Sequence, residues 1–149
     1  MPAPRLELRG VSKTYRNGSQ PTEVLHDISL SPEAGAITAV VGRSGCGKTT
    51  LLHLAGAMDF PTAGEVLIDG RATGSLSDAE LTALRRTRVG FVFQFFQLLP
   101  TLTALENVEL PLLLARTQGG TETARDRLRW VGLEAKAASL QAALTAGKQ

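Results

Sequence analysis

Cysteine, histidine and aromatic residues are scarce in this chain, and the scarcity of the first two excludes classes of protein. The 149 residues include one cysteine, which cannot form an internal disulfide, so a disulfide-stapled secreted scaffold is excluded. A zinc site built mainly from cysteines is excluded as well, since only His26 and His53 remain as imidazole ligands. Charge of either sign is not in excess, with 16 Lys+Arg against 14 Asp+Glu. This balance neither requires nor excludes nucleic acid.

Long apolar runs are also missing, which excludes a signal peptide or a membrane span within these residues. The longest run without a charged residue lies between Arg88 and Glu106 and is interrupted by Gln94, Gln97 and Pro100. It falls short of the ~20 apolar residues that a spanning helix needs. We therefore expect a cytoplasmic protein, unless a partner holds it at a membrane. Hydrophobic residues make up 43% of the chain, which excludes wholesale disorder.

Apolar periodicity predicts mixed strands and helices in the first two-thirds of the chain and helices alone in the last third. Strands are expected in five segments: 6–11, 24–30, 37–41, 65–68 and 89–93. The run 37–41 is continuously apolar, which is typical of a strand buried on both faces of a parallel sheet. Helices are expected over four segments: 48–58, 78–86, 104–116 and 122–131. Ser77 with Glu80, and Thr103 with Glu106, have the spacing of capping boxes, and Gly132 is expected to cap the last helix.

The sharpest local signal is Gly-Arg-Ser-Gly-Cys-Gly-Lys-Thr at residues 42–49, which fits the phosphate-binding pattern G-x-x-x-x-G-K-[ST] at every fixed position. Glycines let the backbone turn its N–H groups inward, and the following helix points its positive end at the same place. Lys48 adds a charge for the β- and γ-phosphates, and the Thr49 hydroxyl suits Mg²⁺. The residues assigned to ATP binding in this loop are Gly42, Arg43, Ser44, Gly45, Cys46, Gly47, Lys48, Thr49 and Thr50.

Two alternatives to this interpretation stay open at the level of the loop itself. A glycine-rich turn between a strand and a helix, with a merely solvated lysine, has the same composition. The motif also does not separate transport ATPases from small-molecule kinases or GTPases.

Segments on both sides of the loop resemble the ATP-binding subunit of an ATP-binding cassette (ABC) transporter, over about Leu6 to Gln149. They are Leu8-Arg-Gly-Val-Ser-Lys-Thr-Tyr15, the stretch 54–70, and Arg88-Val-Gly-Phe-Val-Phe-Gln94. The resemblance implies an α/β fold, a P-loop NTPase of the ABC ATPase type with a mostly helical subdomain. It also implies that Tyr15 stacks on adenine, which a flat ring does well, and that Gln94 contacts Mg²⁺ and the attacking water. A half-buried strand tyrosine and a loop glutamine are the alternatives, and Gln97 is a weaker candidate for the second role.

The stretch from Phe95 to Val108 resembles the family's passage into the helical subdomain, where a coupling helix of the membrane permease is gripped. The alternative is that Phe95, Leu98 and Leu99 fill the core of that subdomain. The sequence of this stretch most resembles those of the branch that serves lipoprotein release and macrolide-type efflux. We expect residues 1–94 to form the ATP-binding core lobe and residues 95–149 to form the helical subdomain.

Leu144-Thr-Ala-Gly-Lys-Gln149 resembles the family's Leu-Ser-Gly-Gly-Gln signature, which reaches across a head-to-tail dimer to the partner's ATP. Leu144, Thr145, Ala146 and Gly147 are assigned to that role, although Ala146 and Lys148 depart from the pattern. The alternative is an alanine-rich terminus that resembles the signature by chance. The family's Mg²⁺-binding aspartate, catalytic glutamate and switch histidine follow the signature, and the 149 residues contain none in those places. We therefore expect a chain truncated after the signature, lacking the C-terminal part of the core, with weak or no hydrolysis alone.

The expected function is that of an ATP-binding subunit with ATP and Mg²⁺ as cofactors, working as a dimer on a membrane permease subunit or domain. Such a protein is cytoplasmic and peripheral on the inner face of the cell membrane. One alternative is a non-catalytic ATP-binding regulatory module. Another is an ABC-type ATPase of DNA repair or translation, which the lack of a basic cluster disfavours, so no nucleic-acid partner is expected.

Overall fold

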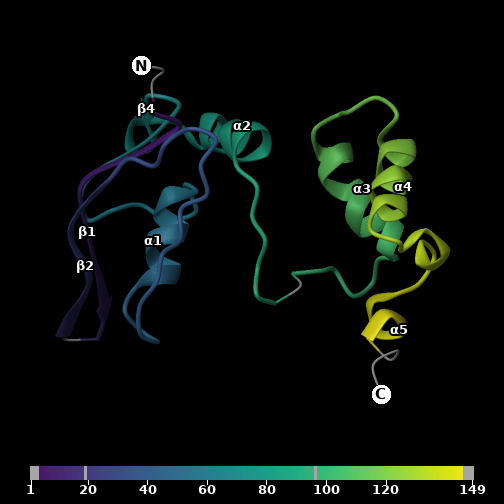
Figure 1. The fold of residues 1–149 in the computed structure, drawn as a ribbon, viewed down its shortest axis with the longest axis horizontal. Helices are drawn as coiled ribbons and strands as arrows, with labels where there is room; N and C mark the ends of the chain where they lie inside the picture. Colours follow the sequence, from purple (N-terminus) through teal and green to yellow (C-terminus); the bar gives the residue numbers. More distant parts are fainter. Residues whose placement is uncertain (1–3, 19, 96, 146–149) are drawn as a thin grey trace. The chain divides into compact units, whose positions relative to one another are not determined.

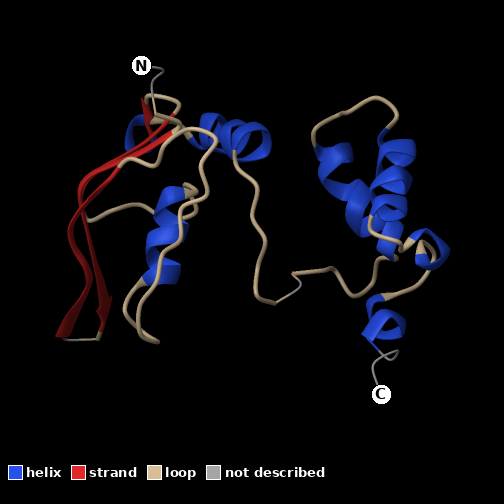
Figure 2. Ribbon diagram, viewed as in Figure 1, coloured by secondary structure: helices blue, strands red, loops and turns tan. Residues whose placement is uncertain are grey.

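The computed structural model describes residues 4–18, 20–95 and 97–145 as two compact units (Figure 1). The first unit is Met1–Phe91 and the second is Val92–Gln149. The named strands all belong to the first unit, whereas the second is built from helices and loops (Figure 2). Within the described ranges, no helix has the length and apolar character needed to cross a membrane. The chain is thus of mixed α/β class.

The first unit contains a four-stranded antiparallel sheet in the order β2-β1-β3-β4. The strands are β1 (Leu6–Asn17), β2 (Gln20–Leu30), β3 (Ala63–Ile68) and β4 (Arg71–Ala72). Strand β1 lies between β2 and β3, with Tyr15 opposite Thr22 and Leu8 opposite Val66. Its register slips around Gly10, whose φ is +55°. Gly64 of β3 packs against this part of β1, where only glycine fits, because a Cβ at position 64 would lie 2.2 Å from the carbonyl oxygen of Gly10.

Helix α1 (Lys48–Ala55) packs its apolar side on this sheet. Leu54 is fully buried, and Leu51 packs beside it against a cluster drawn from three strands: Leu8, Val11, Leu25 and Val66. The helix ends in a Schellman-type turn, in which Ala57 adopts a φ of +54° and Met58 donates its N–H to the carbonyl of His53. Burial of these side chains, about 1.5–3 kcal/mol each, fixes the position of α1 on the sheet.

Helix α2 (Asp78–Arg88) closes the first unit and confirms the first predicted capping box. The Ser77 hydroxyl accepts from the N–H of Glu80, and the Glu80 carboxylate accepts from the N–H of Ser77. Leu81 and Leu84 of this helix form a second buried cluster with Ala57 and Ile68. The short 3-10 helix η1 (Thr73–Ser75) connects β4 to α2.

Two of the expected strands are wrong for this structure. Residues 37–41 and 89–93 belong to no strand, and the described sheet has no parallel pair. Ile37 and Val92 are fully exposed. A strand needs neighbours for its backbone hydrogen bonds, and no described strand pairs with either segment. Val89 and Phe91 are packed, although they form no strand. Val89 packs against the cluster that contains Leu81 and Leu84, and the Phe91 ring packs so closely on Gly56 that a Cβ there would lie 2.0 Å from Cζ.

The second unit is built on two helices, α3 (Ala104–Leu114) and α4 (Gly120–Trp130), which pack through buried Ala104, Ala124 and Leu128. Thr103 and Glu106 form the second predicted capping box. Gly132, with a φ of +74°, caps α4 as expected: it donates to Arg129, and Leu133 donates to Leu128. The chain continues through η2 (Glu134–Lys136) to the short α5 (Gln141–Thr145).

Candidate functional site

The glycine-rich loop before α1 is shaped by positive φ angles and by close contacts at two of its glycines. Gly45 and Gly47 have φ values of +79° and +90°, which L side chains rarely adopt. A Cβ at Gly47 would lie 2.9 Å from the carbonyl oxygen of Val24 on β2. A Cβ at Gly42 would lie 2.6 Å from the sulfur of Cys46. The loop is therefore tied to the sheet at Val24 and folds tightly on itself.

The N-terminus of α1 lacks the side-chain cap that α2 and α3 have. Both α2 and α3 start with a capping hydroxyl and a glutamate in the first turn. Helix α1 starts after Gly47, which offers no capping side chain, and its first turn contains no acidic residue. The first intrahelical bond runs from Leu51 N–H to Gly47. The preceding N–H groups and the positive end of the helix thus suit an external anion.

Lys48, the first residue of α1, folds its side chain back over the loop. Its Nζ donates to the carbonyl oxygens of Gly42, at 2.9 Å, and of Arg43, at 2.6 Å. The sulfur of Cys46 lies 3.6 Å from the same nitrogen. The ammonium is therefore held at the loop by neutral acceptors, and phosphate oxygens are stronger acceptors for a cation.

The other residues of the motif lie on the surface around this lysine. Arg43, Ser44 and Cys46 are exposed in the loop, and Thr49 is exposed in the first turn of α1. Thr50 is half-buried in the same turn. The structure thus gathers every predicted residue of this motif at one end of one helix.

Tyr15 lies on β1 in a cluster with two residues that the sequence does not mark as its partners. Its hydroxyl donates to Asp59 Oδ2 over 2.9 Å, and Lys13 Nζ donates to Asp59 Oδ1 over 2.7 Å. The Lys13 nitrogen also lies over the Tyr15 ring, 4.9 Å from its centroid. Asp59 follows α1, 44 residues from Tyr15, so only the fold brings them together. The one signal in the sequence is the Lys-x-Tyr spacing, which places both side chains on one face of a strand.

The carboxyl of Asp59 is charged in this cluster. Partial burial raises its pKa, but hydrogen bonds from Lys13, the N–H of Phe60 and the Tyr15 hydroxyl, with the charge of Lys13, outweigh that effect. The pKa of Asp59 therefore lies below its ordinary value. An ionised carboxylate can accept all three of these hydrogen bonds at once.

The remaining predicted residues belong to the second unit and are described apart from the loop. Gln94 is exposed in an irregular segment, and Gln97 has a φ of +51°. Leu144 and Thr145 end α5, whereas Ala146, Gly147 and Lys148 lie outside the described residues. The structure therefore places the lysine, the threonines and the tyrosine in the first unit, whereas Gln94, Leu144 and Thr145 belong to the second.

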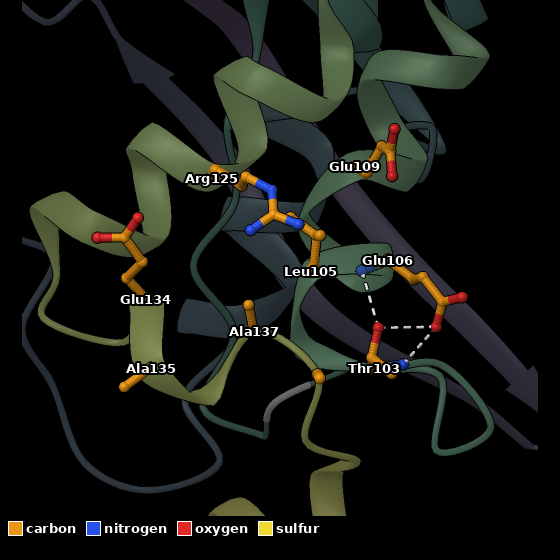
Figure 3. Close-up of a pocket in the computed structure, with 9 residues that line it drawn as sticks. Thr103, Leu105, Glu106, Glu109, Arg125, Glu134, Ala135 and Ala137 are labelled. Carbon is orange, nitrogen blue, oxygen red and sulfur yellow. Dashed lines mark hydrogen bonds between the residues drawn. The ribbon is translucent and has the colours of Figure 1, made fainter.

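A separate hollow of about 480 Å³ lies within the second unit (Figure 3). Arg125 of α4 projects into it beside Leu105, with Glu106 and Glu134 at its sides. Glu106 is held by Thr103 in the capping box, and Glu134 pairs with Arg129, whose hydrogen bonds lower the pKa of the Glu134 carboxyl. None of its nine lining residues belongs to the predicted site.

Comparisons with known proteins agree with this geometry. A model of the ABC transporter family (ABC_tran) matches residues 25–149. One similar solved structure is the ATP-binding cassette MJ0796, a dimer in a post-hydrolysis state bound to ADP and Pi, with 40% identity and a TM-score of 0.83. It is matched over 91% of this chain and 61% of its own. A second dimeric structure, of MJ0796 as a bacterial ABC transporter cassette, gives 41% identity and a TM-score of 0.81, over 89% and 60%. This chain thus spans about three fifths of the length of these cassettes.

Proposed function

Because this chain belongs to the ABC transporter ATP-binding family, we propose that it binds ATP with Mg²⁺ at the loop before α1. The family binds nucleotide with Mg²⁺, and the loop here has the sequence pattern of a phosphate-binding loop. The observation that carries the proposal is the uncapped N-terminus of α1, with the Lys48 ammonium held beside it on the carbonyls of Gly42 and Arg43. Free N–H groups, a helix dipole and a full positive charge converge on one exposed place.

In the proposed complex, the phosphates are held mainly by backbone. The free N–H groups at the start of α1 and in the loop before it supply the donors, whereas the Cys46 N–H would first have to leave the carbonyl of Arg43. Lys48 turns from the loop carbonyls to the β- and γ-phosphates. Gly42 and Gly47 keep the loop free of Cβ atoms where it folds most tightly. The exposed Thr49 hydroxyl would ligate Mg²⁺. Bound Mg²⁺ supplies charge neutralisation between the phosphate oxygens.

Two further contacts are proposed for the nucleotide. Tyr15 stacks on adenine. The support is that its half-buried ring lies on β1, and β1 pairs with β2, the strand that contacts Gly47 of the loop. Gln94 completes the Mg²⁺ site through its amide oxygen, in line with its place after the segment 88–93. We assign residues 1–94 to the ATP-binding core lobe and 95–149 to the helical subdomain.

At the level of the whole protein, we propose the ATP-binding subunit of an ABC transporter of the lipoprotein-release or macrolide-efflux branch. Two subunits pair head to tail, with Leu144, Thr145, Ala146 and Gly147 facing the partner's ATP, and the dimer drives a membrane permease. The dimeric state of the MJ0796 structures supports this arrangement. Because the chain spans 61% of that cassette, we propose that the Mg²⁺-binding aspartate, catalytic glutamate and switch histidine come from further sequence. The chain alone then binds ATP but hydrolyses it weakly or not at all.

The test is the affinity for ATP with and without Mg²⁺, measured by isothermal titration calorimetry. Lys48→Ala should weaken MgATP binding by roughly tenfold to a hundredfold, since hydrogen bonds to charged groups contribute about 1.5–3 kcal/mol. Lys136→Ala is the matched control, because Lys136 is an exposed lysine of η2 in the other unit, and its affinity should match that of the wild type. Equal affinities for the two alanine variants would contradict the proposal.

A further inference from the structure

Lys13, Asp59 and Tyr15 form a cluster of three polar side chains that the binding of phosphates does not explain. Asp59 accepts from Lys13 Nζ, from the Tyr15 hydroxyl and from the N–H of Phe60, at 2.7, 2.9 and 2.7 Å. Lys13 Nζ donates in addition to the carbonyl of Phe60, at 2.7 Å. The Lys13 side chain is only 12% exposed, although a lysine side chain normally extends into water. The hydrogen bonds therefore hold all three side chains in one arrangement.

The two faces of the Tyr15 ring have different surroundings. The Lys13 ammonium lies over one face, 4.9 Å from the ring centroid. The ring edge is fixed by the hydroxyl, which has Asp59 as its acceptor. A base that stacks on Tyr15 must therefore use the face opposite Lys13. A tyrosine free to rotate would lose rotational freedom on stacking, and this one has already lost it.

The cluster also lies close in register to the phosphate loop. Lys13 stands opposite Leu25 on β2, and Tyr15 stands opposite Thr22. Gly47 of the loop approaches the same part of β2, with its ideal Cβ position 2.9 Å from Val24 oxygen and 3.0 Å from Leu25 Cδ2. The α1 helix lies along these strands (Figure 1). The loop that would hold the phosphates contacts β2, and Tyr15 lies on the neighbouring strand β1.

We infer that Asp59 and Lys13 are positioning residues for base recognition: Asp59 fixes the hydroxyl of Tyr15, and Lys13 covers one ring face, so that the opposite face is presented to adenine. This inference rests on the proposed function. It gives the segment after α1 a role in recognising the base, separate from the role of the loop before α1 in recognising phosphates. Asp59 and Lys13 act through Tyr15 and touch no part of the nucleotide.

The test compares two ligands that share phosphates but not a base: MgATP and inorganic triphosphate with Mg²⁺, both titrated calorimetrically into the chain. Asp59→Asn removes the charge at nearly constant size, and Tyr15→Phe removes only the hydroxyl. Each should weaken MgATP binding by about threefold to tenfold and leave the triphosphate Kd unchanged. Tyr15→Ala should cost more, roughly tenfold or above, because base–aromatic stacking itself is lost.

Two controls separate positioning from general damage. Asp69→Asn is the matched control, because Asp69 is a partly exposed loop aspartate held by Arg5 and Arg88, away from Tyr15. Its Kd should match the wild type for both ligands. The double variant of Asp59→Asn and Tyr15→Phe should be no weaker for MgATP than the weaker of the two single variants, since both act on the same hydrogen bond.

The inference is overturned if Asp59→Asn weakens both ligands equally, if the double variant shows additive losses, or if Tyr15→Phe binds MgATP as the wild type does. The last result decides the matter even if Asp59→Asn fails to fold, because Tyr15→Phe keeps the ring and its packing. Failure of the proposed function looks different: the wild type then binds neither ligand, or Lys48→Ala leaves the triphosphate Kd unchanged, and the inference falls with it.

Discussion

Lys48 Nζ lies 2.6 Å from the carbonyl oxygen of Arg43, so the lysine of the glycine-rich motif donates a hydrogen bond to its own loop. This contact, with the one to Gly42 at 2.9 Å, keeps a mobile type of side chain beside the free N–H groups of α1. The loop can adopt this form because two of its glycines have positive φ and because one of them touches the neighbouring strand β2. The phosphate site therefore depends on backbone shape as much as on charge.

Gly47→Ala should destabilise the first unit by at least about 1 kcal/mol, because a left-handed conformation strains an L residue. Its Cβ would in addition lie 2.9 Å from the Val24 oxygen. Urea denaturation followed by circular dichroism measures the loss. Gly74→Ala is the control, because it has no positive φ and nothing within 4 Å of its ideal Cβ, and it should stay within about 0.5 kcal/mol of the wild type. Equal effects for both variants would contradict the loop geometry.

Leu54→Ala should lower the free energy of unfolding by roughly 2–5 kcal/mol, because it empties a fully buried position between α1 and the sheet. Ile37→Ala should change it by less than about 0.5 kcal/mol in this chain, because Ile37 is fully exposed. Chemical denaturation of the two variants side by side decides between the sequence pattern, which predicts a buried strand at 37–41, and the structure. A large loss for Ile37→Ala would favour the pattern.

Glu80→Gln should destabilise the chain at neutral pH, with the difference from the wild type shrinking under acid. Hydrogen bonds from the N–H and hydroxyl of Ser77 and from Arg71 lower the pKa of the Glu80 carboxyl below its ordinary 4.5. A lowered folded-state pKa gives stability that is present above 4.5 and is lost as the pH falls through the lower value.

Denaturation curves between neutral pH and the acid range measure this difference. Ser77→Ala provides a second arm: without the hydroxyl that caps α2, its deficit should also shrink as Glu80 becomes protonated. A deficit of Glu80→Gln that stays constant with pH would show that the charge of Glu80 has no role in the capping box.

Trp130 should report a water-exposed indole in the folded chain. It is the single tryptophan of the sequence, and at the end of α4 it is 82% exposed. Its fluorescence emission should lie at the red end of the tryptophan range and be quenched by acrylamide nearly as well as free tryptophan. Unfolding in urea should shift the emission little, and a large red shift on unfolding would contradict the structure.

Much of the local structure follows from neighbouring residues alone. Both capping boxes need only a hydroxyl and a glutamate three residues apart, and the cap at Gly132 needs only a residue that tolerates positive φ. The lysine and threonine of the phosphate motif are adjacent in the chain, so one helix start places both. Such features are short-range, and their geometry is set within one or two turns of backbone.

What the tertiary structure decided is long-range. Whether 37–41 is a buried strand depends on partners elsewhere in the chain, and here the side chains of Ile37 and Val41 face solvent instead. The contact between Tyr15 and Asp59 joins a strand to a segment 44 residues away, and no local pattern announces it. By itself the sequence determined the chemistry of the phosphate loop and the starts of its helices, because those depend on adjacent residues. Only packing, which brings distant residues together, decided what surrounds the loop and how the ring of Tyr15 is held.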